Sequence, residues 1–270
     1  MVRKIENFIK KFYLIIVFIF LYTPIVSLII FSFNDSKTMG NWTGFTFKWY
    51  IELFHNERIK EALFYTVVIA IISSIVATII GTLAAISINK MKGSKKALLL
   101  NINYLPVLNP DIVTGISLMS LFIFIRPLTK LDFGFTTMLI AHITFNIPYV
   151  VLSVLPKLRQ LPDNIEEAAL DLGATPSFTL RKIILPQIKP GIISGMLMAF
   201  TMSIDDFVIS FFTSGPGVTN LSIEIYSMAR RGIKPEINAL STLMFLTVLI
   251  FLLIVNRKEF TGGDKIEKTK

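Results

Sequence analysis

The sequence contains no cysteine and few charged residues. Without cysteine the chain can form neither disulfides nor thiolate-based catalytic and metal sites. Charged residues make up only 17% of its 270 residues and hydrophobic residues 53%, and the mean hydropathy is +0.66. This composition excludes a water-soluble surface, and it also excludes disorder, which requires low hydrophobicity. We therefore expect an integral membrane protein.

Several chemical motifs are also absent. The phosphate-binding pattern G-x-x-x-x-G-K-[ST] does not occur, so ATP hydrolysis would need a separate subunit, and we do not expect an enzyme. The two histidines, His55 and His142, are far apart in the sequence and lack ligand-like neighbours. We therefore expect no metal site and no cofactor, and we expect His142 to be a hydrogen-bonded helix residue. No basic cluster is interleaved with aromatic residues on a soluble domain, which argues against a nucleic-acid partner.

The apolar residues form long continuous runs rather than an alternating pattern. A helix needs about 20 apolar residues to cross about 30 Å of hydrocarbon. Nearly charge-free stretches of this length occur at 12–34, 62–89, 97–125, 133–156, 190–212 and 237–256. The first is too long for a cleaved signal peptide, and we expect it to be retained. The sequence thus predicts an all-α integral membrane fold of six transmembrane helices, with one permease-like domain over 1–256 and a charged cytoplasmic tail at 257–270.

Basic residues are distributed unequally between alternate loops. All 27 Lys and Arg lie outside the six predicted spans, and 18 of them fall on the side that carries both termini. The positive-inside rule places this side in the cytoplasm. The basic excess also suits contact with anionic membrane lipid.

The longest cytoplasmic segment, about 157–189, has the pattern of two short helices. Asp163 and Glu166 form a capping-box-like pair at the start of the first helix. Gly173 stands where that helix would end in a left-handed residue. Thr175 followed by proline is typical of the start of a second helix, which we expect to end at Pro186. By pattern alone, this segment is either a surface loop lying on the membrane or a helix offered to a partner.

One spacing within this segment is specific. The pattern E-A-A, three residues, Gly, nine residues, I-x-L-P resembles the signature loop of bacterial ABC importer permeases. The residues at these places are Glu167, Ala168, Ala169, Gly173, Ile183, Leu185 and Pro186. The resemblance implies the fold of a type I importer permease, whose coupling helix binds in a cleft of the ATP-hydrolysing subunit. Glu166 and Glu167 would contact the ATPase, the two alanines would permit close packing, and Gly173 would make the turn.

Three acidic residues, Asp111, Asp205 and Asp206, lie within predicted spans. An ionisable group at bilayer depth is expensive unless it faces a polar cavity or a partner. Asp111 lies 14 residues after Ala97 and Asp205 lies 14 residues after Gly191, near the cytoplasmic starts of their spans. Both would then lie about 21 Å from the cytoplasmic side. Carboxylates at one depth favour a pathway for a cationic substrate. The alternative is that they are hydrogen-bonding groups at helix ends or between helices.

Over almost its whole length the chain also resembles the permease subunits of spermidine/putrescine importers. The matching strings are FSFN (31–34), NWTGFTFKWY (41–50), PDIVTGISL (110–118), SIDDFVISFF (203–212), GPG (215–217) and IYSMARRGIKPEINALSTL (225–243). The resemblance implies four kinds of partner: a paralogous permease subunit, two copies of an ATP-binding subunit, an extracytoplasmic polyamine-binding protein and membrane lipid. Polyamine ammonium groups would meet Asp111, Asp205 and Asp206, with Ser203 adding a hydroxyl and Trp49 a cation–π contact.

Three rival functions stay open at this point. The chain could be an ABC permease for another small solute, such as iron or thiamine, and then only the substrate would differ. It could be a proton-coupled secondary carrier with the aspartates as a relay, but this would leave the cytoplasmic loop unexplained. It could also be a membrane anchor that transports nothing, in which case neutralising the acids would have no effect.

One further pattern concerns packing. Gly191 and Gly195 form a G-x-x-x-G at the start of the fifth predicted span, which predicts a close approach to another helix.

Overall fold

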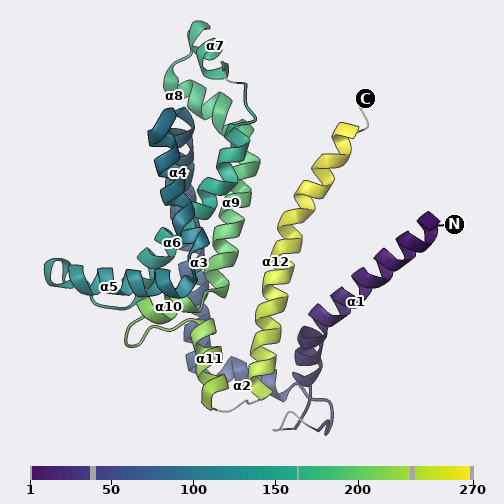
Figure 1. The fold of residues 1–270 in the computed structure, drawn as a ribbon. Helices are drawn as coiled ribbons and strands as arrows, with labels where there is room; N and C mark the ends of the chain where they lie inside the picture. Colours follow the sequence, from purple (N-terminus) through teal and green to yellow (C-terminus); the bar gives the residue numbers. More distant parts are fainter. Residues whose placement is uncertain (1, 37–40, 163, 232–234, 268–270) are drawn as a thin grey trace. The chain divides into compact units, whose positions relative to one another are not determined.

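The long apolar stretches form α-helices in the computed structural model, which describes all residues except 1, 37–40, 163, 232–234 and 268–270 (Figure 1). Among the described residues the extended pairing is limited to one isolated bridge, between Asn34 and Phe45. The predicted all-helical membrane fold is confirmed. Five helical segments are long and apolar enough to cross a bilayer, and Pro235–Ile250 is a shorter apolar helix within the described residues.

The helices are named by their order along the chain. In chain order they are α1 (Val2–Phe31), α2 (Lys48–His55), α3 (Glu57–Lys90), α4 (Gly93–Leu108), α5 (Asp111–Thr129), α6 (Phe135–Leu158), α7 (Ile165–Asp171), α8 (Pro176–Phe178), α9 (Leu185–Asp205), α10 (Val208–Thr213), α11 (Leu221–Arg231) and α12 (Pro235–Glu267). A π-helical turn, Thr179–Ile184, joins α8 to α9. Contacts divide the chain into a terminal unit, residues 1–60 with 224–270, and a central unit, residues 61–223.

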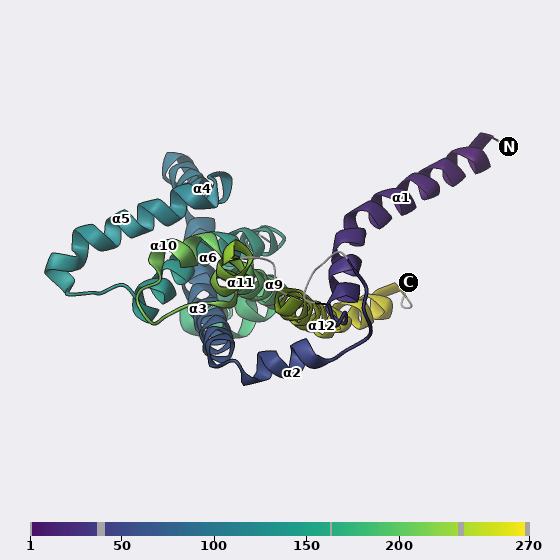
Figure 2. The same cartoon turned by 90° about the horizontal axis from the view of Figure 1, so that it is seen from below.

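The third predicted span, 97–125, is two helices rather than one. α4 ends at Leu108, and Asn109 is extended with ψ of 146°. The break arises because Pro110 disfavours helical geometry in the residue before it and donates no hydrogen bond. Within the central unit α5 lies crosswise to the direction of α3, α6 and α9 and extends sideways from them (Figures 1 and 2). The rise along one continuous helix therefore does not give the depth of Asp111.

The fifth predicted span, 190–212, is also divided. α9 runs from Leu185 to Asp205, and Asp206 then leaves the helix with ψ of 124° before the six-residue α10 begins. The two adjacent aspartates therefore belong to different helix ends. They are not neighbours 100° apart on one helix, as a continuous span would require.

The core of the central unit is the contact between α6 and α9. Val150, Val154 and Ile188 are buried there with other aliphatic side chains. Gly191 and Gly195 lie against α6, and a Cβ on Gly191 would come 2.9 Å from the backbone oxygen of Ser153. The close helix approach predicted from these two glycines is confirmed. A second core cluster joins α5, α6 and α10.

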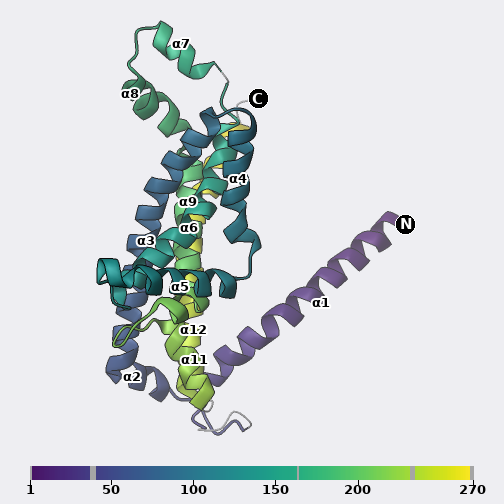
Figure 3. The same cartoon turned by 60° about the vertical axis from the view of Figure 1, so that its left-hand side comes forward.

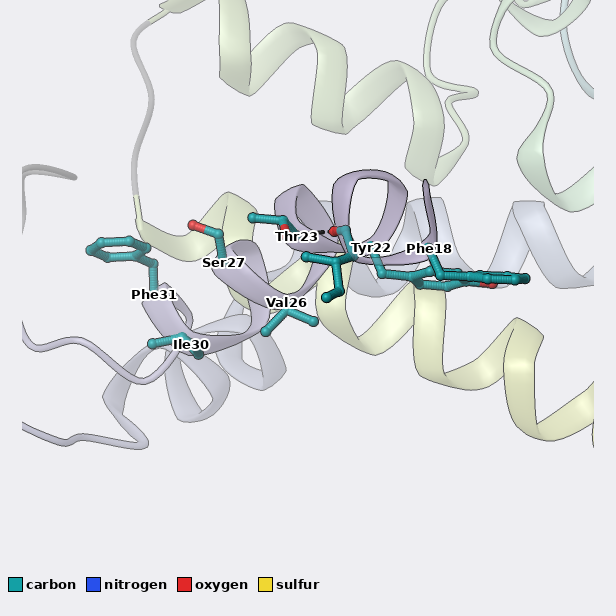
Figure 4. Close-up of a pocket in the computed structure, with 8 residues that line it drawn as sticks. Phe18, Tyr22, Thr23, Val26, Ser27, Ile30 and Phe31 are labelled. Carbon is teal, nitrogen blue, oxygen red and sulfur yellow. Dashed lines mark hydrogen bonds between the residues drawn. The ribbon is translucent and has the colours of Figure 1, made fainter. Parts of the chain in front are cut away.

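In the terminal unit α12 packs against both α1 and α2. An apolar groove of about 530 Å³ runs along α1, where Phe18, Tyr22, Val26 and Ile30 are among its lining residues (Figure 4). The most apolar stretch of α1 has no buried residue within this chain. Such a helix requires lipid or helices of another subunit around it. The assignment of residues 1–256 to one permease domain stays a prediction.

Candidate functional site

The cytoplasmic loop predicted from the sequence lies at one end of the central unit, where α7 and α8 extend beyond α4 (Figure 3). Gly173 follows α7 with φ of +85°, and its N–H donates to the carbonyl of Leu170 at 2.8 Å. Thr175 caps α8, since its Oγ1 accepts from the N–H of Phe178 at 3.3 Å, and Pro176 is at the first helical position. The predicted glycine end and threonine–proline start are both confirmed.

The start of α7 differs from the expected capping pair. Asp163 lies outside the described residues, and Asn164 precedes the helix without a side-chain cap. Glu166 instead forms an ion pair with Lys90 at the end of α3, with Nζ and Oε1 2.5 Å apart. This contact links the predicted coupling loop, about residues 157–189, to the α3–α4 turn.

The exposed surface of α7 and of the residue that follows it is acidic and apolar. Glu167 and Ala168 are exposed, whereas Ala169 is buried against the rest of the loop. Leu172 is 89% exposed. The docking of this surface on an ATPase subunit stays a prediction.

The second half of the motif anchors the loop to the bundle. Ile183 and Leu185 are partly buried, and Leu185 packs on the core of the central unit. The expectation that Pro186 ends the second short helix is wrong. The π-helical turn leads directly into α9, and Pro186 lies in the first turn of that helix. Proline is tolerated in the first turn because an N–H there is not needed for a hydrogen bond within the helix.

Asp206 is held by the helix that follows it. One carboxylate oxygen accepts the N–H of Ile209 at 3.1 Å, and the other accepts both the N–H and the hydroxyl of Ser210, at 2.7 and 2.8 Å. The side chain is 7% exposed and lies 3.5 Å from Nε2 of His142. Asn220 donates to the backbone oxygen of Asp206 and to Ser210 Oγ. The carboxylate thus caps the amino end of α10.

Ser203 belongs to the same buried network. Its hydroxyl lies 2.6 Å from Nδ1 of His142 and 3.1 Å from the hydroxyl of Ser73 on α3. Nε2 of His142 lies 2.9 Å from Ser210 Oγ, so the imidazole joins α9 to α10 from its place on α6. Ser203 is 2% exposed.

Asp205 and Asp111 have different surroundings. Both are exposed, and among the described residues neither carboxylate has a hydrogen bond or ion pair. Asp111 is the first residue of α5, where the positive end of the helix dipole stabilises an anion. Asp205 is the last residue of α9, where the dipole is negative. A carboxylate at this end reinforces a negative potential, which a cation would relieve.

Trp49 lies in the terminal unit. It is 4% exposed, and its indole Nε1 donates to the backbone oxygen of Asn34 at 2.7 Å. The ammonium of Lys48 lies 5.3 Å from its ring centroid. The ring is thus able to take part in a cation–π contact, and it already has a cation of its own chain beside it.

Sequence reasoning did not identify Asn146 and Asn220 as members of the buried network. Asn146 lies four residues after His142 on the same face of α6 and donates to Ser73 at 3.4 Å. This spacing of two polar residues in an apolar helix was the available signal. No such signal indicated Asn220, because the fold of the loop after α10 brings it to Asp206. No group of three or more metal-ligating side chains occurs in the described part of the chain.

The Asp206 cap leads to a stability prediction. Asp206→Ala should destabilise the protein by roughly 1–2 kcal/mol, because the amide and hydroxyl donors at the start of α10 lose their acceptor. Asp205→Ala should leave the stability unchanged, since its carboxylate is exposed and unpaired among the described residues. The midpoint of thermal unfolding of the detergent-solubilised protein measures both. Equal shifts in the two variants would contradict the assignment of the cap to Asp206.

The chain is similar to known transport proteins. The family model described as "Binding-protein-dependent transport system inner membrane component" matches residues 77–257. The chain is 38% identical over 253 residues to the spermidine/putrescine transport system permease protein PotC of Shigella flexneri, covering 92% of this chain and 94% of that protein. It is 42% identical over 237 residues to the putrescine transport system permease protein PotI of Escherichia coli K12, covering 86% and 83%.

The fold is also found in solved importers. A bacterial ABC transporter that imports the acidic polysaccharide alginate matches with a TM-score of 0.75 at 18% identity, covering 99% of this chain and 97% of that chain. The MetNI methionine ABC transporter matches with a TM-score of 0.60 at 18% identity, covering 75% and 96%. The chain therefore belongs to the family of binding-protein-dependent inner-membrane transport components, and within it to the permease subunits of the PotC and PotI type.

Proposed function

We propose that this chain is the permease subunit through which an ATP-driven importer moves polyamines, spermidine or putrescine, into the cell. The identity of 38% to PotC and 42% to PotI over most of the chain carries this proposal. As a family member, the chain is a multi-pass inner-membrane component that works with an ATPase and a binding protein and is not itself catalytic.

The chemistry of the carboxylates supports a cationic substrate. A polyamine carries several ammonium groups. Asp205 offers a carboxylate that no other described residue pairs with, at the carboxyl end of α9, where cations are favoured. Asp111 offers a second one at the start of α5. Separate, exposed carboxylates bind a polycation in weak successive steps, which suits a pathway because a transit site must also release its ligand.

The other predicted pathway residues take supporting roles in this proposal. Asp206 and Ser203 are buried and hydrogen-bonded, so they hold the α9–α10 junction that presents Asp205. We keep the proposed cation–π role for Trp49. Because this residue is 4% exposed, a passing ammonium would reach only the exposed part of its ring.

The predicted coupling loop and the exposed apolar surface of α1 support a proposal for the assembly. We propose a pair formed by this chain and a paralogous permease, with two ATP-binding subunits below and a polyamine-binding protein above. Closure of the ATPases would move the coupling helices and open the pathway outward, and hydrolysis would release the polyamine inward. Lipid and the second permease would cover α1, whose apolar side chains are exposed in this chain.

Reconstituted transporter tests the substrate class. ATP hydrolysis by the full complex should rise when the binding protein is loaded with spermidine or putrescine, because substrate delivery drives the cycle. The assay adds each polyamine separately, with iron or thiamine as control solutes. Stimulation by a control solute and by neither polyamine would overturn the proposal.

The orientation is a separate proposal. Most basic residues lie on the side of the two termini, so we expect both termini in the cytoplasm. A reporter fused to the C-terminus should then be active in the cytoplasm and inaccessible to external protease. Accessibility from outside would reverse the orientation.

A further inference from the structure

A groove of about 920 Å³ lies on the inner side of the coupling loop, between the α3–α4 turn, the end of α6 and α7. We call it the lysine groove. Its charged lining residues are Lys90, Lys92, Lys96, Arg159, Glu166 and Glu167. All of these belong to the central unit.

The positive charges of the groove are only partly used. Lys90 pairs with Glu166, and the ammonium of Lys96 donates to the backbone oxygen of Asn89 at 3.2 Å, which leaves its charge unneutralised. Among the described residues, the side chains of Lys92 and Arg159 have no hydrogen bond or ion pair. Among the described lining residues, four are basic and two are acidic. Their net positive charge favours an anion as the ligand of the groove.

The groove is also amphipathic and large. Leu158 and Ile184, each 5% exposed, form part of its wall at the core of the unit. A volume of about 920 Å³ is at the upper end of the range of small-molecule sites and exceeds what one inorganic anion fills. Apolar walls with cations around them match a molecule that carries a phosphate on a hydrocarbon body.

We propose that the lysine groove binds a phosphate group, and its size and apolar wall favour the headgroup of an anionic phospholipid as the source. Basic pockets between helices at the cytoplasmic surface take such headgroups. The phosphate would lie among Lys92, Lys96 and Arg159 and join the α3–α4 turn to the coupling loop next to the Lys90–Glu166 ion pair. This site is distinct from the polyamine pathway and does not depend on the substrate.

Lipid binding by the assembled transporter tests the proposal. The purified complex, ATPase included, is titrated with phosphatidylglycerol or phosphatidylcholine and bound lipid is counted by native mass spectrometry. Wild type should prefer phosphatidylglycerol. The variant Lys92→Gln/Lys96→Gln/Arg159→Gln should bind phosphatidylglycerol on the order of 100-fold more weakly. Each basic residue near an anionic headgroup contributes a similar share of the binding free energy, and the variant removes three of them.

The chain offers a matched control of equal charge change. Lys95→Gln/Arg181→Gln/Lys182→Gln removes three exposed basic residues at the same end that do not line the groove. This variant should bind phosphatidylglycerol like wild type. Equal losses in both triple variants, or no preference for phosphatidylglycerol in wild type, would overturn the site.

Inorganic phosphate distinguishes the two sources of the ligand. If millimolar phosphate leaves phosphatidylglycerol bound, the headgroup is the ligand, whereas displacement of the lipid from wild type identifies the free anion as a ligand of the same groove. Both results support the site. If the ATPase-free permease pair binds phosphatidylglycerol in the groove and the full complex does not, the ATPase fills the groove and the proposal fails.

Discussion

Replacing Asp205 by asparagine should lower polyamine uptake roughly five- to tenfold while the transporter still assembles. The carboxylate lies at the negative end of α9 and is exposed, so the substitution removes an attractive charge without removing a structural contact. A partly solvated ion pair contributes on the order of 1 kcal/mol, and each 1.4 kcal/mol is about tenfold in affinity. Uptake of radiolabelled spermidine and putrescine in cells that depend on this chain measures the effect.

Three further variants make this test specific. Asp205→Glu keeps the charge and should retain most of the uptake. Asp132→Asn removes an exposed carboxylate that pairs with Arg126 at 2.6 Å, and it should have little effect. Asp111→Asn combined with Asp205→Asn should reduce uptake by roughly the product of the two single effects if both carboxylates contact the substrate independently. Normal uptake in the double variant would remove both from the pathway.

Gly173→Val is expected to weaken association with the ATPase about tenfold. Gly173 has φ of +85°, which a β-branched residue adopts only at a cost of about 1–2 kcal/mol or more. The loop would avoid this cost by changing its turn, and the exposed face around Glu167 and Leu172 would then no longer meet the ATPase cleft. Co-purification of the ATPase with the tagged permease pair measures the association.

The surroundings of Gly173 allow the conformational effect to be isolated. In the described part of the chain, apart from Gly173 and its two neighbours, no atom lies within 4 Å of a Cβ built at this position, so a steric clash with these residues does not explain a defect. Gly173→Asn should therefore be close to wild type, because asparagine tolerates the left-handed region. Equal loss with valine and asparagine would mean that the glycine serves close contact with the partner and not its own turn.

The structure separates two residues that the sequence could not rank. Asp205 and Asp206 are adjacent and of the same type, and a continuous helix would have made both candidates for the pathway. The break at Asp206 gives the second carboxylate three donors at the start of α10 and leaves the first exposed. A network that includes His142, Ser203 and Ser73 then holds this junction from two other helices.

Local features of the chain were predictable. The helical class follows from apolar runs of about 20 residues, because backbone polar groups in lipid must be satisfied within one helix. The glycine end of α7 and the threonine cap of α8 depend on the conformational preferences of one or two residues, so the sequence indicates them directly. The close approach at Gly191 follows in the same way from the missing side chain.

Other features were decided by the tertiary structure. Pro110 interrupts the third predicted span, yet only the packing of α5 on α10 sets its crosswise direction in the central unit. Pro186 does not end a helix, since a π-helical turn places it at the first turn of α9. Asp206 lies beside His142 of another helix, and the ion pair between Lys90 and Glu166 joins residues that are 76 positions apart. Such contacts depend on how helices pack, and hydropathy along the chain carries no information about which polar groups will meet.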